Sequence, residues 1–378
     1  MPDPVTAFPW ELLGRLVDTP GGSFDVDAIN RVGDLLTTHL EALGYAVARH
    51  PVTGHGDAVV AELTAGGDGP APTLVLVGHS DTVWPADYDP SWRFTLGGTR
   101  AEGPGVGDMK AALLLAAEAG RRAVDALAVR GLGARVVLLV IPDEEVGSVA
   151  SRPLVDRWVA EADLCVGLEA GKPGDGYVTS RGAVGAMKVE VTGRAVHVTE
   201  PGGVNALDAL VPIATEVAAL SGPEVLVSVC HLEAGASRQV AAGRGFLEVD
   251  LRADDDEVLE AAVDGVRRIA ARVADGFAGE VVVHGGRTRP GLPVERSAEP
   301  WRLLLAVHGP GQVPFGVHER GGSDASTFAA AGVPTLDGFG PVCFHNCAEG
   351  EYVTVESVER RTALLADLLV AWVEEAGR

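Results

Sequence analysis

Five residues of metal-binding type lie in separate motifs that span more than half of the chain. They are His79, Asp108, Glu145, Glu169 and His345. Imidazole nitrogens and carboxylate oxygens are the ligands that a hydrolytic two-metal site needs, together with a bridging carboxylate and a base beside the attacking water. The set therefore predicts a dinuclear metal centre whose chemistry is metal-assisted hydrolysis.

The acidic residues of this set suggest different roles. Asp108 is the candidate for the bridging carboxylate, and Glu145 and Glu169 would each complete one metal. Glu144 stands next to Glu145, and neighbouring side chains of an extended segment point to opposite sides, so we do not expect both to bind one metal. We assign Glu144 as the general base, which accepts a proton from the attacking water and delivers it to the leaving amine.

Asp81 lies two residues after His79 and could accept the second imidazole N–H, which would fix the tautomer of that ligand. Taken singly, all these residues have ordinary explanations. A histidine after a strand is commonly a polar loop residue, Asp108 could cap the helix that follows it, and Glu144 with Glu145 could be a solvated pair of charges. The combination, mostly at the ends of predicted strands, favours the metal site.

Three apolar runs that precede these residues predict buried strands. Residues 73–77, 135–141 and 164–168 are nearly continuous apolar stretches, as expected of strands covered on both faces. Each is followed by a candidate site residue, and open α/β sheets bind ligands beyond the carboxyl ends of their strands. Helices are expected over 27–43 and 109–130 from the spacing of apolar residues. The predicted fold class is α/β, with a mixed sheet flanked by helices.

A change of pattern near Ala183 predicts a second domain. Strands are expected at 187–191, 225–232, 245–252 and 280–283, with helices at 205–220 and 256–273. This β-α-β-β-α-β order is that of a ferredoxin-like α+β domain, and the Pro- and Gly-rich stretch 288–293 indicates the return to the first domain. We expect a catalytic domain built from residues 1–182 and 293–378, interrupted by an inserted domain at 183–292.

The composition excludes some classes of binding partner and indicates a cellular location. The 378 residues carry a formal net charge of −23, which argues against nucleic acid and anionic membranes as partners. The N-terminus has no signal-peptide pattern and no run of 18 apolar residues occurs, so a cytoplasmic protein is expected. The four cysteines indicate no disulfide framework. Cys343 and Cys347 flank His345, and we interpret them as reduced loop thiols because no second cysteine pair accompanies them.

Several motifs resemble those of one hydrolase family. They are GHSDTVWP, GPGVGDMKAA, PDEEVGS, LEAG, GRAVH, GGSDASTFAAAGVPTLDG and a histidine ahead of EYV, in this order along the chain. The set resembles the dizinc metallopeptidases and amidohydrolases that include acetylornithine deacetylase, succinyl-diaminopimelate desuccinylase, aminoacylase and glutamate carboxypeptidase. It looks most like the glutamate carboxypeptidase branch. The resemblance implies a zinc-exopeptidase-type sheet, with the inserted domain serving for dimerisation and as a lid.

The resemblance also implies how the ligands are divided between the two metal ions. His79, Asp108 and Glu169 would bind one metal, and Asp108, Glu145 and His345 the other. The cofactor would be two divalent ions per subunit, with Zn²⁺ expected and Co²⁺ or Mn²⁺ as alternatives. The peptide bond after Asp108 is expected to be cis. Glu144 would activate the water that lies between the metals.

Beyond the metals, the resemblance points to residues that meet the substrate. His197, in GRAVH, would reach the active site of a partner subunit and stabilise the oxyanion, so a homodimer is expected. Arg252 would bind a substrate carboxylate, for which a guanidinium offers two parallel hydrogen bonds. Gly321 and Gly322 would form a loop around the same carboxylate. Gln239 stands where the family has a substrate-binding asparagine.

Three departures from the family pattern concern the substrate more than the metals. Gln239 is one methylene longer than asparagine, and the proline of the family motif is absent after it. Val198 and Thr199 replace the small pair that usually follows the histidine of GRAVH. His345 comes earlier, relative to Glu351, than the family pattern leads us to expect.

The predicted function is hydrolysis of an amide or peptide bond next to a free carboxylate, in an N-acyl amino acid or a short peptide. This covers a glutamate carboxypeptidase-like enzyme and an N-acyl-amino-acid deacylase. The alternative is a catalytically silent dimer of the same fold that binds an amino-acid derivative, which the presence of Glu144 and all five ligand candidates disfavours. The glycines of 103–107 suggest a nucleotide-binding loop, but no Lys-Ser/Thr follows and no GxGxxG opens a helix.

Overall fold

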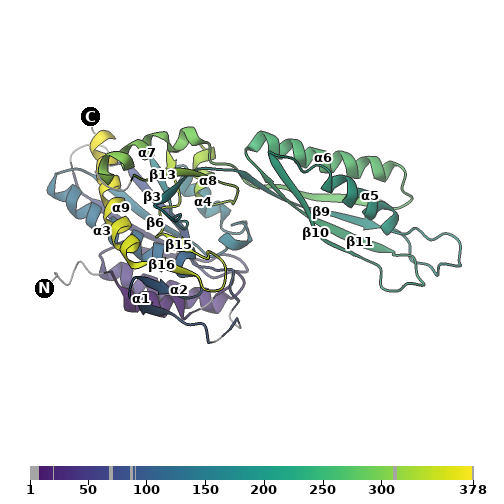
Figure 1. The fold of residues 1–378 in the computed structure, drawn as a ribbon, viewed down its shortest axis with the longest axis horizontal. Coiled ribbons are helices and arrows are strands. Elements are labelled where there is room, and N and C mark those ends of the chain that lie inside the picture. The colour runs from purple at the N-terminus through teal and green to yellow at the C-terminus, as the bar shows by residue number, and fades with distance from the viewer. Residues whose placement is uncertain are drawn as a thin grey trace. The chain divides into compact units, whose positions relative to one another are not determined.

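One unit of this chain is inserted in the sequence of another. The computed structural model describes residues 8–19, 21–67, 71–85, 88–89, 91–309 and 313–376. The larger unit comprises Met1–Ser180, Leu292–His318 and Ser323–Arg378, and the inserted unit comprises Arg181–Gly291 and Glu319–Gly322. Figure 1 shows the elements of both units.

A six-stranded mixed sheet is the scaffold of the larger unit. Its strands are β1 (Ala46–His50), β2 (Ala58–Ala65), β3 (Thr73–His79), β6 (Ala134–Ile141), β7 (Leu164–Gly167) and β14 (Thr335–Leu336). They lie in the order β1-β2-β6-β3-β7-β14. The four strands from β6 to β14 are parallel, whereas β2 pairs antiparallel with both β1 and β6. The apolar runs at 73–77, 135–141 and 164–168 thus form β3, β6 and β7.

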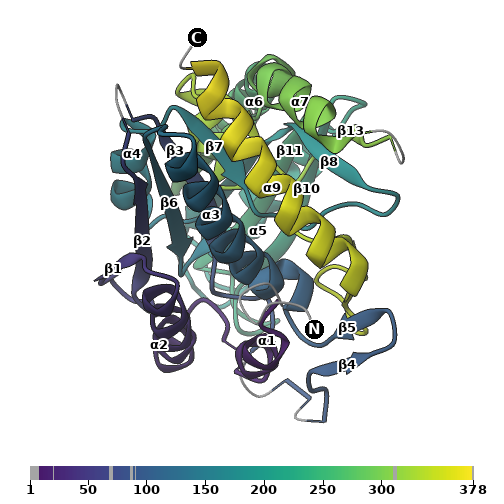
Figure 2. The same ribbon diagram turned by 90° about the vertical axis from the view of Figure 1, so that its left-hand side faces the viewer.

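Helices cover both faces of this sheet. In β3, Leu74 and Leu76 lie in a core shared with α3 (Ala111–Val129) and α9 (Val355–Ala376), which cross the same face in Figure 2. Val75 and Val77 lie in a second core with α4 (Arg152–Val159) and α8 (Ala325–Ala330). Successive side chains of a strand point to opposite faces, so a strand covered twice is apolar at every position.

The larger unit also contains α1 (Trp10–Val17), α2 (Val26–Ala42), α7 (Val294–His308) and two short turns, η1 (Val106–Lys110) and η2 (Glu144–Val146). The helix predicted at 109–130 begins two residues later, because the π-helical turn η1 precedes α3. Within η1, Asp108 has non-helical backbone angles (φ −123°, ψ 88°). It does not cap α3, whose N-cap position is Lys110. Among the described helices, none combines the length and apolarity that a membrane span requires.

A small sheet brings the loop of residues 345–351 to the segment before Asp108. Its strands are β4 (Thr95–Gly97), β5 (Arg100–Glu102), β15 (Cys343–Phe344) and β16 (Tyr352–Thr354), in the order β15-β16-β5-β4. Tyr352 pairs with Glu102, and Cys343 pairs with Val353. The loop therefore starts and ends in strands that are fixed beside β5. A two-stranded sheet pairs β8 (Gly176–Arg181) with β13 (Phe315–Glu319).

The inserted unit is a four-stranded antiparallel sheet with two helices on one face. Its elements are β9 (Ala183–Thr192), α5 (Leu207–Ala218), β10 (Val225–Ala234), β11 (Arg244–Ala253), α6 (Asp256–Asp275) and β12 (Glu280–Arg289). The strand order is β10-β11-β9-β12. Val189 and Val191 are buried under the helices, whereas the alternate residues Lys188 and Glu190 are not. The predicted β-α-β-β-α-β order and the α/β fold class are confirmed, although β12 continues to Arg289, into the stretch predicted as a hinge.

A buried arginine ties α9 to loops of the larger unit. Arg361 is fully buried, and its Nη2 donates a hydrogen bond to Asp175 Oδ1 at 3.0 Å. The same guanidinium donates to the carbonyl oxygens of residues 176, 338 and 340 at 2.7–2.9 Å. Asp175 also pairs with Arg360 and with His308 Nε2. Burial opposes the charge of Asp175, but its hydrogen bonds with Arg360 and His308 and the charges of the two arginines outweigh burial and lower its pKa to about 2.

Candidate metal centre

The parallel strands of the larger unit deliver the predicted ligands to one edge of the sheet. His79 is the last residue of β3 and lies opposite Ile141, the last residue of β6, so Glu144 and Glu145 follow at the same edge. In β7, Gly167 lies opposite Val77, which puts Glu169 level with His79. His79 Nε2 is 3.0 Å from Asp108 Oδ1 and 4.0 Å from Glu169 Oε1.

Two groups of potential ligand atoms meet at this edge. One consists of His79, Glu144 and Glu169, and the other of His79, Asp108 and Glu145, each with its atoms within 4.8 Å of one another. His79 belongs to both. The structure therefore brings four of the five predicted ligands together. Glu144 and Glu145 fall in different groups, but they belong to the 3₁₀ turn η2 and not to the extended segment that the prediction assumed.

His345 belongs to neither group. Its side chain is exposed, and its ring centroid lies 6.2 Å from that of Tyr352. The neighbouring residues of the loop face the centre instead: Asp108 Oδ2 accepts hydrogen bonds from Asn346 Nδ2 at 3.1 Å and from Cys347 Sγ at 3.0 Å. Sequence reasoning gave Asn346 no role and set Cys347 aside as a loop thiol.

Glu351 fixes the backbone that carries Asp108. Its carboxylate is fully buried, and Oε1 accepts hydrogen bonds from the N–H groups of Gly107 at 2.6 Å and Asp108 at 3.1 Å. The peptide bond between Asp108 and Met109 is cis, as expected. Glu351 belongs to the EYV motif, but no role could be predicted for it because the contact joins positions 244 residues apart.

Asp81 organises the loops around His79 from a fully buried position. The carbonyl oxygen of Asp81 lies 2.9 Å from His79 Nδ1, and its carboxylate lies 3.4 Å from the same nitrogen. The carboxylate also accepts hydrogen bonds from the N–H groups of Glu144 and Glu145 at 3.2 and 3.0 Å. Ser23 Oγ donates to it at 2.7 Å. Asp81 thus orients both the imidazole and the strand end after β6, and Ser23 is a further member that the sequence did not reveal.

Electrostatic crowding distinguishes this cluster. Burial raises the pKa of Glu145 to about 8, and the charges of Asp108 and Glu144 raise it further against the opposing effect of His79. Burial would lower the pKa of His79, but its hydrogen bonds to Asp108 and Asp81 outweigh burial and raise that pKa well above its usual range. A proton on Nε2 occupies the lone pair that a metal ion would take.

A divalent metal pair fits these residues. Glu145 Oε1 is buried and has no hydrogen-bond partner among the described residues. An ionised oxygen in that state is costly unless a cation meets it. Nitrogen and carboxylate donors on two sides of Asp108 form the kind of set that two divalent ions require.

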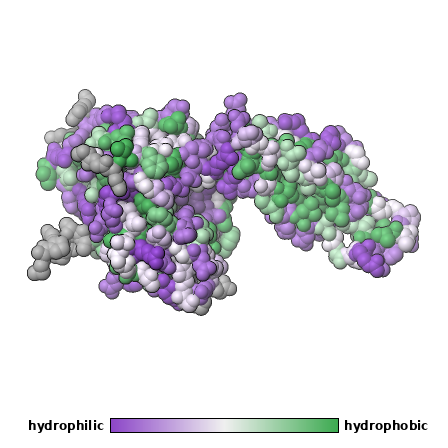
Figure 3. Space-filling model, viewed as in Figure 1, coloured by the Kyte–Doolittle hydropathy of each residue, from purple (hydrophilic) through white to green (hydrophobic). Residues whose placement is uncertain are grey.

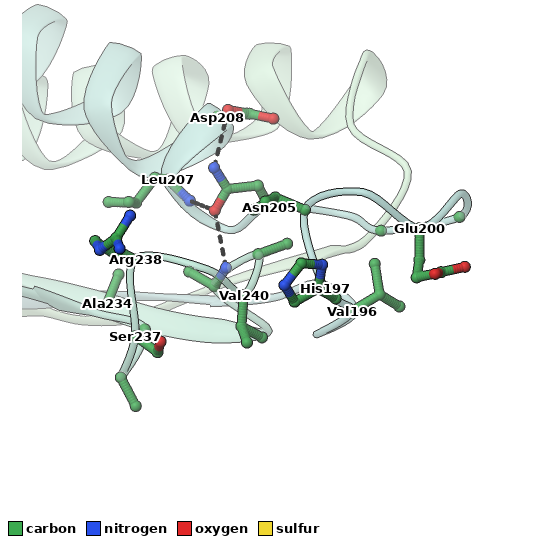
Figure 4. A pocket seen from close by; sticks show the side chains of 17 residues that line it. Val196, His197, Glu200, Asn205, Leu207, Asp208, Ala234, Ser237, Arg238 and Val240 are labelled. Atoms are coloured by element: carbon green, nitrogen blue, oxygen red, sulfur yellow. Dashed lines mark hydrogen bonds between the residues drawn. The ribbon is translucent and has the colours of Figure 1, made fainter.

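The residues predicted in the inserted unit lie in different settings. His197 lines an open pocket of about 850 Å³ together with Arg238 and Glu200, and its Nδ1 is 2.7 Å from Thr199 Oγ1. Figure 4 shows His197 among the side chains that line this pocket. Asn205 joins the loops around it, because its Oδ1 accepts from Ala242 N at 3.1 Å and from Leu207 N at 3.4 Å, and its Nδ2 donates to Asp208 Oδ1 at 3.3 Å. Gln239 is not among the residues that line the pocket.

The predicted carboxylate-binding residues already have partners within the inserted unit. Arg252 donates from Nε and Nη2 to the two carboxylate oxygens of Asp250 at 2.8 and 3.0 Å. The carbonyl oxygen of Gly321 accepts from Arg181 at 2.9 Å. A Cβ atom at Gly322 would lie 2.4 Å from the side chain of Arg289, so close packing explains this glycine.

Comparison with known proteins places this geometry in one family. The model of Peptidase family M20/M25/M40 matches residues 75–371, well over half of the chain. The chain belongs to this family. The predicted relationship to dizinc metallopeptidases and amidohydrolases, and the prediction of a hydrolase, are therefore confirmed.

Individual relatives agree with the family assignment. Carboxypeptidase G2 from Pseudomonas sp. (strain RS-16) is 26% identical over 373 residues, which cover 95% of this chain and 88% of that protein. The M20 family metallo-carboxypeptidase Sso-CP2 from Sulfolobus solfataricus has a TM-score of 0.71 at 18% identity, over 97% of this chain and 99% of the other. YxeP from Bacillus subtilis, a dinuclear metal-binding M20 peptidase, has a TM-score of 0.65 at 16% identity, over 97% of each chain.

Proposed function

We propose that this protein hydrolyses an amide or peptide bond next to a free carboxylate, with a dinuclear metal centre at the edge of the β3-β6-β7 sheet. The observation that carries the proposal is the shared position of His79 in two groups of carboxylates. The 26% identity to carboxypeptidase G2 supports a substrate with a C-terminal carboxylate. We infer that the substrate is an N-acyl amino acid or a short peptide.

His79, Asp108 and Glu169 are the proposed ligands of one metal, and Asp108 with Glu145 hold the other. Asp108 is the bridge because its two oxygens have different neighbours, with His79 on the side of Oδ1. Two such ions would polarise the amide carbonyl and lower the pKa of water, and Zn²⁺ matches the donor set. Asp81 positions His79 through Nδ1, which leaves Nε2 as the ligand atom.

Glu144 is the proposed general base. Its carboxylate lies in the group with His79 and Glu169, whereas Glu145 belongs to the group with His79 and Asp108. The hydrogen bond from its N–H to Asp81 fixes the backbone at this point. A half-buried carboxylate held in this way can take a proton from the attacking water at its oxygen and deliver it to the leaving nitrogen.

We further propose that the protein acts as a homodimer and that His197 stabilises the oxyanion in the partner subunit. Figure 3 shows hydrophobic residues gathered over α5 and β10 of the inserted unit, where Val211, Leu226 and Leu232 are exposed. β10 is an edge strand, and an exposed apolar edge favours pairing with another chain. Mixing His197→Ala and Glu144→Gln protomers should restore part of the activity. No recovery in mixed dimers would contradict action across subunits.

The central test measures metal content and amine release together. Protein purified without chelator is analysed for metal per chain, and free amino acid is detected after incubation with a panel of N-acyl amino acids and dipeptides. We expect about two zinc-like ions per chain, and release that disappears in Glu144→Gln although its metal content is unchanged. Absence of metal from the wild-type protein, or turnover that survives in Glu144→Gln, would contradict the proposed function.

A further inference from the structure

We infer that Thr199 is a positioning residue, which holds His197 in the tautomer that carries the ring proton on Nε2. The inference rests on the proposed function and deepens it, because an imidazole donates a hydrogen bond to an oxyanion only through a protonated nitrogen. Thr199 belongs to the pair of residues that departs from the family pattern after the histidine of GRAVH. The inference gives this departure a role in the reaction.

Two groups of Thr199 approach the same ring nitrogen of His197. Thr199 Oγ1 lies 2.7 Å from Nδ1, and the Thr199 N–H donates to Nδ1 in a longer hydrogen bond of 3.4 Å. A hydroxyl group can donate or accept, but a backbone N–H can only donate. Nδ1 must therefore offer its lone pair to Thr199. In a neutral imidazole one nitrogen is the acceptor and the other carries the proton, so the proton of His197 is on Nε2.

The protonated nitrogen of His197 is available to a ligand. Among the described residues, Nε2 has no hydrogen-bond partner. The residue lines the open pocket of about 850 Å³, and Figure 4 shows its ring among the lining side chains. The arrangement thus leaves one N–H group of the ring free to donate, while the other nitrogen is occupied by Thr199.

The backbone around His197 explains how Thr199 reaches the ring. Residues 197–200 form a turn, which is closed by the hydrogen bond from Glu200 N to His197 O at 2.8 Å. The start of the turn is bridged to the neighbouring loop, where Val240 lies opposite His197. Thr199 is therefore held at the third position of the turn. Because threonine is β-branched, its side chain has few alternative rotamers, which favours a fixed hydroxyl.

A comparison with His79 shows what the tautomer decides. Nδ1 of His79 faces acceptors, since the carbonyl oxygen of Asp81 lies at 2.9 Å and its carboxylate at 3.4 Å. Such a partner keeps a proton on Nδ1 and leaves the lone pair of Nε2 for a metal. Nδ1 of His197 faces a donor instead, so Nε2 carries the proton. The environment of His79 suits a cation, whereas that of His197 suits an anion such as the oxyanion.

Nuclear magnetic resonance of the ring nitrogens tests the tautomer without reference to activity. The full-length wild type and its variants are labelled with a nitrogen isotope in their histidines, and His197→Ala identifies the signals of His197. Spectra are recorded at about pH 8, where an ordinary imidazole is neutral. We expect the Nε2–H tautomer in the wild type and in Thr199→Ser, and a larger share of the Nδ1–H tautomer in Thr199→Val. A ring proton on Nδ1 in the wild type, or identical signals in Thr199→Val, would overturn the inference.

Steady-state kinetics tests whether the tautomer matters for the reaction. The oxyanion forms only in the transition state, so Thr199→Val should lower kcat by about 3- to 10-fold and leave KM unchanged. Thr199→Ser restores the hydroxyl and should recover most of this loss. Thr215→Val is the matched control, because it removes another exposed threonine hydroxyl of the inserted unit, on α5 and outside the pocket. It should leave kcat unchanged.

The outcomes separate this inference from the proposed function. An unchanged kcat in Thr199→Val, or an equal loss in Thr199→Ser, would overturn the positioning role of Thr199 while the wild type still hydrolyses its substrate. A wild type that hydrolyses no amide of the panel would overturn the proposed function, and the role of Thr199 in the reaction with it.

Discussion

Two clusters of the larger unit shift the pKa of a carboxylate in opposite directions. Asp175 meets the guanidinium groups of Arg360 and Arg361 and the imidazole of His308. At the sheet edge, Asp108, Glu144, Glu145 and Glu169 converge on the imidazole of His79. The pKa of Asp175 is lowered to about 2, whereas that of Glu145 is raised to about 8.

The difference separates a structural cluster from a functional one. The chain supplies the cations for Asp175, so this ion-pair cluster is complete when the protein has folded. At the sheet edge Glu145 is crowded by the charges of Asp108 and Glu144, and its buried Oε1 has no hydrogen-bond partner among the described residues. A strongly raised pKa at a carboxylate beside other carboxylates is typical of a functional site, which agrees with the metal centre proposed above.

The largest effect on activity is expected from substitution of Glu144, the proposed general base. Glu144→Gln should lower kcat by about 100- to 10,000-fold, because the amide cannot accept the proton of the attacking water. Metal content and thermal stability should remain those of the wild type. Steady-state kinetics combined with elemental analysis checks this. Loss of one metal in Glu144→Gln would identify Glu144 as a ligand and reverse its role with that of Glu145.

The comparison predicts a purely structural effect at Asp175. Asp175→Asn leaves the buried Arg361 without its counter-charge and should destabilise the protein by about 3–5 kcal/mol, measured by urea unfolding. Asp264→Asn, which removes an exposed ion pair with Arg267, is the matched control and should change stability by less than about 1 kcal/mol. Two metals should still bind to folded Asp175→Asn protein. A metal-free variant would show that the two clusters are coupled.

Acidification should reduce the difference in stability between the wild type and Asp175→Asn. The folded-state pKa of Asp175, about 2, is below its ordinary value of 3.8, so its contribution is complete above pH 3.8 and is lost as the pH falls through about 2. The difference in unfolding free energy between the two proteins should therefore shrink over this window. A difference that grew on acidification would contradict the ion-pair assignment.

The smallest expected effect concerns Ser23. Ser23→Ala removes the hydrogen bond to Asp81 Oδ2 and should weaken metal binding by about 10-fold, because Asp81 then holds His79 less firmly. Ser91→Ala, which removes an exposed hydrogen bond to Asp89, should leave metal affinity unchanged. Competition with a chromophoric chelator measures both. Equal affinities in the three proteins would show that Asp81 needs no support from Ser23.

The sequence could predict the strands and four of the candidate ligands because both follow from local patterns. A strand covered on both faces is an apolar run, and parallel strands place the residues after them at one edge, so His79, Glu145 and Glu169 could be expected together. Asp108 was recognisable from its glycine-rich surroundings and the family resemblance. The strands of the inserted unit could also be predicted, because the alternation of buried and exposed residues follows from the local sequence.

Other features depend on contacts or angles that no local pattern encodes. The orientation of residues 345–347 follows from the left-handed backbone conformations of His345 and Cys347. Neither residue type predicts such a conformation. The bidentate pair between Arg252 and Asp250 was not expected, because the sequence shows a charge but not its partner. Ser23 forms a hydrogen bond with Asp81, 58 residues away in the sequence, and Glu351 forms one with Gly107, 244 residues away. Such distant contacts become visible only when the fold is known.

The hydrogen bonds of Glu351 have a consequence for the order of events during synthesis. The ribosome releases the N-terminal part of a chain first, so Asp108 emerges 243 residues before the carboxylate that fixes its N–H. Until then the N–H groups of Gly107 and Asp108 lack the acceptor that they have in the folded protein. A centre with this backbone contact can therefore form only after the segment around β16 has been synthesised.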